Sequence, residues 1–96
     1  MAINLTGTWT CLGPNGGTYK ILQIGNVVYW RGENPAQHWS NIGYGTVDEA
    51  RQQVSVSWGD PDGGNAGNHG FLFFEVVSND QLKKLAGWGG GDFKRG

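Results

Sequence analysis

Apolar and polar residues alternate along most of this chain, in short runs that turn residues separate. A side-chain period of two is typical of β-strands with one buried face. In the stretch 54–59, Val54, Val56 and Trp58 alternate with serine and glycine, and in 5–11 the residues at odd positions alternate with threonine. No segment of ten or more residues carries an apolar stripe at helical spacing. The pattern therefore predicts an all-β chain.

The clearest local prediction is a hairpin between residues 18–24 and 27–31. Both segments are rich in β-branched and aromatic residues, and Gly25-Asn26 between them is a two-residue hairpin signal. That turn places Ile24 opposite Val27, Gln23 opposite Val28, and Ile21 opposite Trp30. One face of the hairpin then carries Tyr19, Ile21, Gln23, Val28 and Trp30. The other carries Lys20, Leu22, Tyr29 and Arg31, and its two cations mark it as the solvated side.

Further strands are predicted at 40–47, 54–59, 70–77, 82–86 and 93–95, with loops at 33–39 and 60–69. Gly43 and Gly45 predict a bend or bulge in the first of these strands. About eight short strands in a nearest-neighbour meander hide their edges by closing into a barrel or by packing as two sheets. We expect one domain over residues 1–96, a small antiparallel up-and-down barrel. Its interior should be mostly filled, with a shallow cavity, by Trp9, Tyr19, Trp30, Trp58 and Phe74.

Composition excludes several classes of function. A net charge of −1 argues against binding of the phosphate backbone, so no nucleic-acid partner is expected. The longest apolar runs, such as 71–74, are far too short to span a membrane. The first residues lack the basic flank and long apolar run of a signal peptide. One cysteine, Cys11, forms no internal disulfide, which agrees with a reducing compartment such as the cytoplasm.

The segment Leu5-Thr6-Gly7-Thr8-Trp9 is similar to the Gly-x-Trp opening of the calycins, which include lipocalins, fatty-acid-binding proteins and avidins. Its flanking threonines resemble the avidin version most. The chain also looks like small, poorly characterised bacterial domains that begin with Thr-Gly-Thr-Trp-x-Cys. The resemblance implies a calycin-like, streptavidin-like barrel in which an arginine of the last strand packs over the N-terminal Trp. Arg95 stands at that position, and Lys94 is the weaker candidate. The chain is shorter than avidins and lipocalins, and no biotin-binding set maps onto it.

No constellation of catalytic groups is recognisable. Cys11 lies on a predicted buried face, where a thiol is inert. His38 and His69 fall in predicted loops without a partner at metal or triad spacing. We therefore expect no catalytic residue, no cofactor and a non-enzymatic protein. The oxygen-rich loop with Asp60, Asp62 and Asn65 offers calcium-type ligands, although turn chemistry explains the same residues.

Candidate ligand-binding residues come from two oddities. Trp39 and Trp88 lie in predicted loops, where they cap a barrel mouth or stack on a ligand such as a sugar ring. Gln23 and Asn41 are amides expected on inner faces, where they bond to each other and to backbone or point at a ligand. Together with Trp30, they predict a site for a small molecule or carbohydrate at a mouth that the 60–69 loop borders.

The alternative is a structural or oligomer-forming domain without a small ligand. Phe71 and Phe73 are predicted to face outward from a strand whose other face carries Leu72 and Phe74. An exposed apolar patch of this kind marks an interface, unless a loop of the same chain covers it.

Overall fold

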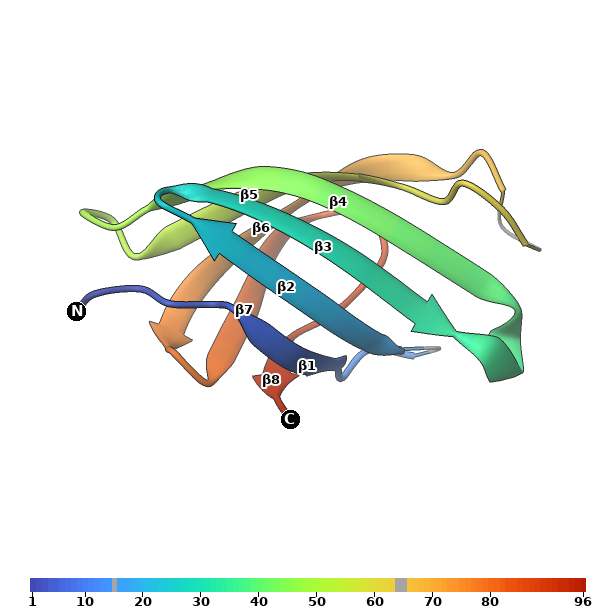
Figure 1. Ribbon diagram of the computed structural model, residues 1–96, viewed down its shortest axis with the longest axis horizontal. Coiled ribbons are helices and arrows are strands. Elements are labelled where there is room, and N and C mark those ends of the chain that lie inside the picture. The colour runs from blue at the N-terminus through green and yellow to red at the C-terminus, as the bar shows by residue number, and fades with distance from the viewer. Residues whose placement is uncertain (15, 64–65) are drawn as a thin grey trace.

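The computed structural model describes residues 1–14, 16–63 and 66–96. It is an antiparallel barrel in which each strand pairs with the next along the chain and the last pairs with the first (Figure 1). The strands are β1 (Gly7–Cys11), β2 (Thr18–Ile24), β3 (Val27–Asn34), β4 (Trp39–Asp48), β5 (Gln53–Gly59), β6 (His69–Ser78), β7 (Gln81–Gly87) and β8 (Phe93–Arg95). The all-β, up-and-down barrel predicted from the alternation is therefore confirmed, with closure rather than two packed sheets.

One short helical element interrupts the strands: η1, a 3-10 turn over Pro35–Gln37 between β3 and β4. Asn34 caps it by accepting a hydrogen bond from the Gln37 amide. No helix in the described part of the chain is long and apolar enough to cross a membrane.

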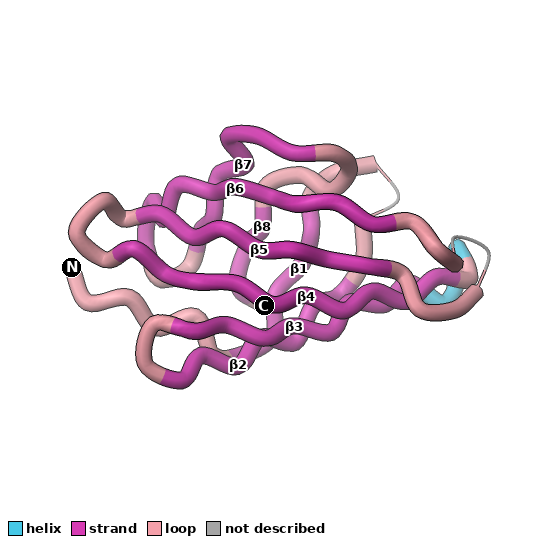
Figure 2. The backbone as a smooth tube through the Cα atoms, turned by 90° about the horizontal axis from the view of Figure 1, so that it is seen from above, coloured by secondary structure: helices cyan, strands magenta, loops and turns pink. Residues whose placement is uncertain are grey.

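The β2–β3 hairpin has the predicted register. Ile24 pairs with Val27, Gln23 with Val28, and Ile21 with Trp30. Seen from above, β3, β4, β5 and β6 continue from it side by side as one curved sheet (Figure 2). The turn chemistry of Gly25-Asn26 thus sets which side chains of two strands point into the barrel.

The bulge, one of the two alternatives predicted at Gly43 and Gly45, is absent, because β4 pairs with β3 and β5 in regular register through both residues. Register shifts occur instead between β6 and β7. A methyl group on Gly43 would overlap the indole of Trp30, which lies directly across the pair. This glycine therefore makes room for a large inward ring.

The interior combines an aromatic cluster with aliphatic Ile, Leu and Val side chains. Phe93 is the centre of the cluster, with ring centroids 4.6 Å from Tyr19, 5.3 Å from Trp30 and 5.2 Å from Phe74. Trp9 is fully buried, and its indole nitrogen donates to the carbonyl of Leu5 at 2.8 Å. Cys11 is buried as predicted. Burial raises the pKa of its thiol above the usual value, which agrees with an inert core thiol.

The two ends of the barrel differ. The turns β2–β3, β4–β5 and β6–β7 lie at one end together with the N-terminal segment 1–6 (Figure 1). Ile3 and Leu5 of that segment are buried and plug this end. We call it the closed end. The other end, which we call the mouth, carries the described parts of the loop after β5 (60–63 and 66–68), the loop 88–92 and η1.

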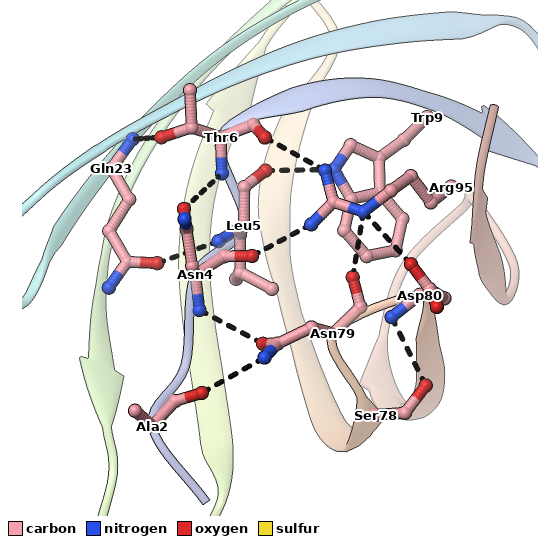
Figure 3. Close-up of polar contacts among 10 residues, drawn as sticks. All are labelled: Ala2, Asn4, Leu5, Thr6, Trp9, Gln23, Ser78, Asn79, Asp80 and Arg95. Carbon is pink, nitrogen blue, oxygen red and sulfur yellow. Dashed lines mark hydrogen bonds and ion pairs between the residues drawn. The ribbon is translucent and has the colours of Figure 1, made fainter.

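Arg95 holds the closed end together (Figure 3). Its guanidinium carbon lies 4.6 Å from the centroid of a Trp9 ring. The same group donates to the carbonyl of Asn4 at 2.7 Å, of Thr6 at 2.8 Å and of Asn79 at 2.9 Å. One side chain of the last strand thereby joins the N-terminal segment to the β6–β7 turn, in the position that the resemblance implied.

Candidate functional site

The mouth contains a half-open cavity of about 240 Å³. Four of the side chains that line it are aromatic: Tyr19, Trp39, Trp58 and Trp88. Asp60 is the one charged residue among the described residues that line it. The site is therefore an aromatic chamber with a single carboxylate.

Trp58 and Trp88 form one wall of this chamber. Their rings are stacked, with centroids 5.5 Å apart and planes 12° from parallel. Trp88 lies in the loop after β7 and is 62% exposed, whereas Trp58 is the next-to-last residue of β5 and is half-buried. The indole nitrogen of Trp58 is buried without a hydrogen-bond acceptor among the described residues. An unpaired buried donor costs about 1–3 kcal/mol, so the position of this ring is not explained by stability alone.

Tyr19 and Trp39 contribute the second pair of rings, with centroids 6.1 Å apart. The prediction that Trp39 lies in a loop is wrong: it is the first residue of β4, where it pairs with Asn34 of β3. The 3-10 turn η1 shortens the connection, so the strand begins at the tryptophan. Trp39 is half-buried and packs against the core at the mouth.

A chain of buried polar groups forms the floor of the site. The indole nitrogen of Trp30 donates to Asn41 Oδ1 at 2.7 Å, and Asn41 Nδ2 donates to Asp60 Oδ1 at 2.7 Å. Because an indole N–H can only donate, Trp30 fixes the orientation of the amide and turns its nitrogen toward Asp60. Asn41 is 5% exposed and Asp60 9% exposed. The interior thus presents a preoriented, shielded carboxylate to the cavity.

The backbone of the 60–68 loop holds Asp60 in this position. The Asp60 amide donates to the carbonyl of Asn68 at 2.8 Å, and the amide of Gly67 donates to the carbonyl of Asp60 at 2.9 Å. Both ends of the loop are therefore tied to each other just where it leaves β5 and enters β6.

The hydroxyl of Tyr19 stays protonated in this site. Burial raises the pKa of Tyr19 far above its usual value, and the neighbouring Cys11 and Asp60 raise it further.

The predicted site residues are divided between three places. Trp39, Asn41 and Trp88 line the cavity. Trp30 lies beneath it as a core residue, 5% exposed, and contacts the lining residues Asn41 and Tyr19. Gln23 lies at the closed end, where its side chain accepts from the Leu5 amide at 2.9 Å and donates to the carbonyl of Ile3 at 3.0 Å (Figure 3). The expected pairing of Gln23 with Asn41 therefore does not exist.

Three residues that form the site are not predicted from the sequence to bind a ligand: Tyr19, Trp58 and Asp60. The sequence predicts Tyr19 and Trp58 as core residues, yet both line the cavity, and Trp58 stands at the mouth end of β5 with Gly70 and Trp88 beside it. Asp60 was considered only as a turn or calcium residue. One sequence feature could have identified both Trp58 and Asp60. The apolar alternation of 54–58 stops at Gly59, so the strand ends there, and the residues on either side of Gly59 lie at the rim of the barrel.

The oxygen-rich loop does not gather its acids around one point in the part that the structure describes. Asp60 accepts from Asn41, whereas Asp62 accepts from the hydroxyl of Ser40. Asn65 lies outside the described residues. Among the residues that are described, no three His, Cys, Asp or Glu side chains lie close enough together to hold a metal ion. His38 follows η1, and His69 begins β6 rather than lying in the loop as predicted.

Phe71 and Phe73 face outward from β6, as predicted. Phe71 is 55% exposed, and Phe73 is half-buried. The register places Phe71 at the end of a row of outward residues that crosses five strands: Leu22, Tyr29, Tyr44, Ser57 and Phe71. All five are exposed, so the outer face of the sheet carries a mostly apolar row.

Comparison with protein-family models, with curated proteins and with solved structures finds no match for this chain. Because one fold hosts many functions, any functional argument has to start from the geometry of the site itself.

Proposed function

We propose that this chain is a non-enzymatic binding module that takes a small molecule or a sugar ring in the cavity at the barrel mouth. The observation that carries the proposal is the buried Asn41–Asp60 pair beneath aromatic side chains in a cavity of about 240 Å³. Ligand sites are typically concave and mostly apolar, with a few placed polar groups that orient the ligand. At about 30 Å³ per water, this cavity has the volume of roughly eight waters, which suits a single small ring or head group.

The proposal of binding without catalysis rests on the inventory of the site. An aromatic site with an acid is also typical of glycoside hydrolases. These enzymes generally use two carboxylates about 5–9.5 Å apart. The described lining of the cavity holds one. Cys11 also lines it, but the raised pKa of its thiol disfavours the thiolate that nucleophilic attack requires.

We further infer kinship with the calycins. The packing of Arg95 over Trp9 within the Gly-x-Trp segment supports it, since that contact closes the barrel in the family that the segment resembles. The kinship carries no ligand with it.

Intrinsic tryptophan fluorescence tests the binding proposal, because three tryptophans line the cavity. The purified protein is titrated with a panel of monosaccharides, small amines and small aromatic compounds. We expect at least one compound to change the emission in a saturable way. Trp88→Ala should abolish that response without loss of fold, and Tyr44→Ala, which removes an exposed aromatic ring away from the mouth, should leave it intact. A panel that produces no saturable response would refute the proposal.

An oligomer-forming domain remains the second candidate, and the exposed row that ends at Phe71 favours it. Phe71 and Phe73 are then buried against a second copy. Sedimentation velocity over a range of concentrations measures this directly. A dimer that Phe71→Ser converts to monomer supports the candidate, and a wild-type protein that stays monomeric at high concentration contradicts it.

A further inference from the structure

We propose that the group recognised in the cavity is an organic cation of the alkylammonium class, with Asp60 as its counter-ion and the aromatic rings as its walls. This inference rests on the proposed function and specifies the chemistry of its ligand. Two features of the site carry it: its charge and its ring composition.

The charge of the site is negative and uncompensated. Asp60 is 9% exposed and forms no ion pair with any Lys, Arg or His of the described residues. The residues outside the described ranges, Asn15, Gly64 and Asn65, are neutral by sequence and supply no formal charge. A buried carboxylate is costly unless a partner of opposite charge or several donors compensate it. Asn41 supplies one donor, so a bound cation would supply the missing charge.

Lys84 does not fill this role. Its Nζ donates to the carbonyl of Gly89 at 2.6 Å. Lys84 is not among the residues that line the cavity, and it forms no ion pair with Asp60.

The walls suit a cation as well. The faces of Trp and Tyr rings carry negative partial charge and attract an ammonium group within about 6 Å, most strongly where water is excluded. Tyr19, Trp39, Trp58 and Trp88 line the same cavity as the carboxylate. Aromatic rings combined with a shielded acid are the arrangement that recognises alkylated ammonium groups.

The charge of Asp60 is the feature that favours a cation over a neutral sugar. Asn41 retains one N–H and one oxygen lone pair, because its oxygen accepts from Trp30 and one amide hydrogen goes to Asp60. Asn68 and Tyr19 also line the cavity and offer an amide and a hydroxyl. These neutral groups can bond to either ligand, but only a cation neutralises the shielded carboxylate.

The test compares choline with 3,3-dimethylbutan-1-ol, in which a quaternary carbon replaces the ammonium nitrogen at nearly the same shape. Tryptophan fluorescence and calorimetric titration of the wild-type protein measure both affinities. We expect choline to bind at least about tenfold more tightly than the neutral alcohol, in line with a desolvated cation–aromatic contact. Equal affinities would overturn the inference, since shape alone would then explain binding.

Two variants isolate the charge. Asp60→Asn retains an oxygen that accepts from Asn41 but removes the negative charge, so it should bring the two affinities close together. Asp62→Asn removes an acid of the same loop that bonds to Ser40 instead, and it should leave the preference for choline unchanged. Circular dichroism verifies that both variants fold. If Asp60→Asn does not fold, the comparison of the two ligands on the wild-type protein still decides.

The outcomes separate this inference from the proposed function. Saturable binding of monosaccharides without binding of choline would refute the proposed cationic ligand but support the proposed binding function. The absence of a saturable response to sugars, amines and aromatic compounds would refute both proposals.

Discussion

Replacing Arg95 with alanine should destabilise the barrel more than any other change of an exposed or half-exposed cation. The side chain is 29% exposed and donates to three backbone carbonyls besides contacting the Trp9 ring. Charge-assisted hydrogen bonds contribute about 1.5–3 kcal/mol when buried, and partial access to solvent reduces each to well under about 1 kcal/mol here. The ring contact adds about 0.5–1 kcal/mol. The ion pair with Asp80 adds little, because the Asp80 side chain is 77% exposed.

The total, about 2–3 kcal/mol, corresponds to a fall in Tm of roughly 10–20 °C for a domain of this size. Thermal unfolding followed by circular dichroism measures it. Lys94→Ala is the matched control, since Lys94 is the exposed neighbour on the same strand, and its Tm should change by no more than about 3 °C. Arg95→Lys should lie between the two, because an ammonium lacks the planar fork that reaches several carbonyls. Equal losses for Arg95→Ala and Lys94→Ala would refute the reasoning.

Three further predictions follow from the core. Trp9→Ala removes a fully buried ring, at a cost of about 3–5 kcal/mol; we expect an unfolded chain by circular dichroism, and a stable variant would contradict its assignment to the barrel floor. Gly43→Ala should lower the urea midpoint, because the added methyl overlaps the Trp30 indole, whereas the control Gly59→Ala meets only ordinary contacts at 3.8 Å and beyond and should change the midpoint little. The raised pKa values of Cys11 and Tyr19 mean that the unfolded chain ionises first. Stability should therefore hold below the ordinary cysteine pKa of about 8.5 and decline above it, and urea midpoints that stay constant to pH 10.5 would contradict this.

Local chemistry predicted the architecture well. The dipeptide Gly25-Asn26 fixed the turn length, and the turn length fixed every pair of the hairpin from Thr18 to Ile24. Period-two patterning then placed the inner faces, because a strand that buries one face has only two choices of orientation. Closure followed from the need to hide two strand edges.

The site was predicted only in part, because sequence alternation shows which face of a strand a residue lies on but not how far along the barrel axis it lies. Inner-face position was established correctly for Gln23, but it lies at the closed end, and alternation does not distinguish one end of a strand from the other. Asp60 is recruited by Asn41, nineteen residues earlier in the chain, through a loop whose path no periodicity describes. At Gly43 the sequence suggests a bend or bulge and not space for a ring, because which residue lies opposite a glycine depends on the register of two strands at once.

The seam between the first and last strands has a consequence for how the molecule is made. β8 is three residues long, and its pairing with β1 joins residues more than eighty positions apart. Contacts of such long sequence separation are slow to form, and Arg95 stands at the far side of that interval. During synthesis, β1 to β7 therefore leave the ribosome before Arg95 does. Until β8 pairs with them, the edges of β1 and β7 are exposed and can pair with other chains. The protein should be most vulnerable to aggregation during synthesis, in the interval before its last turn has emerged.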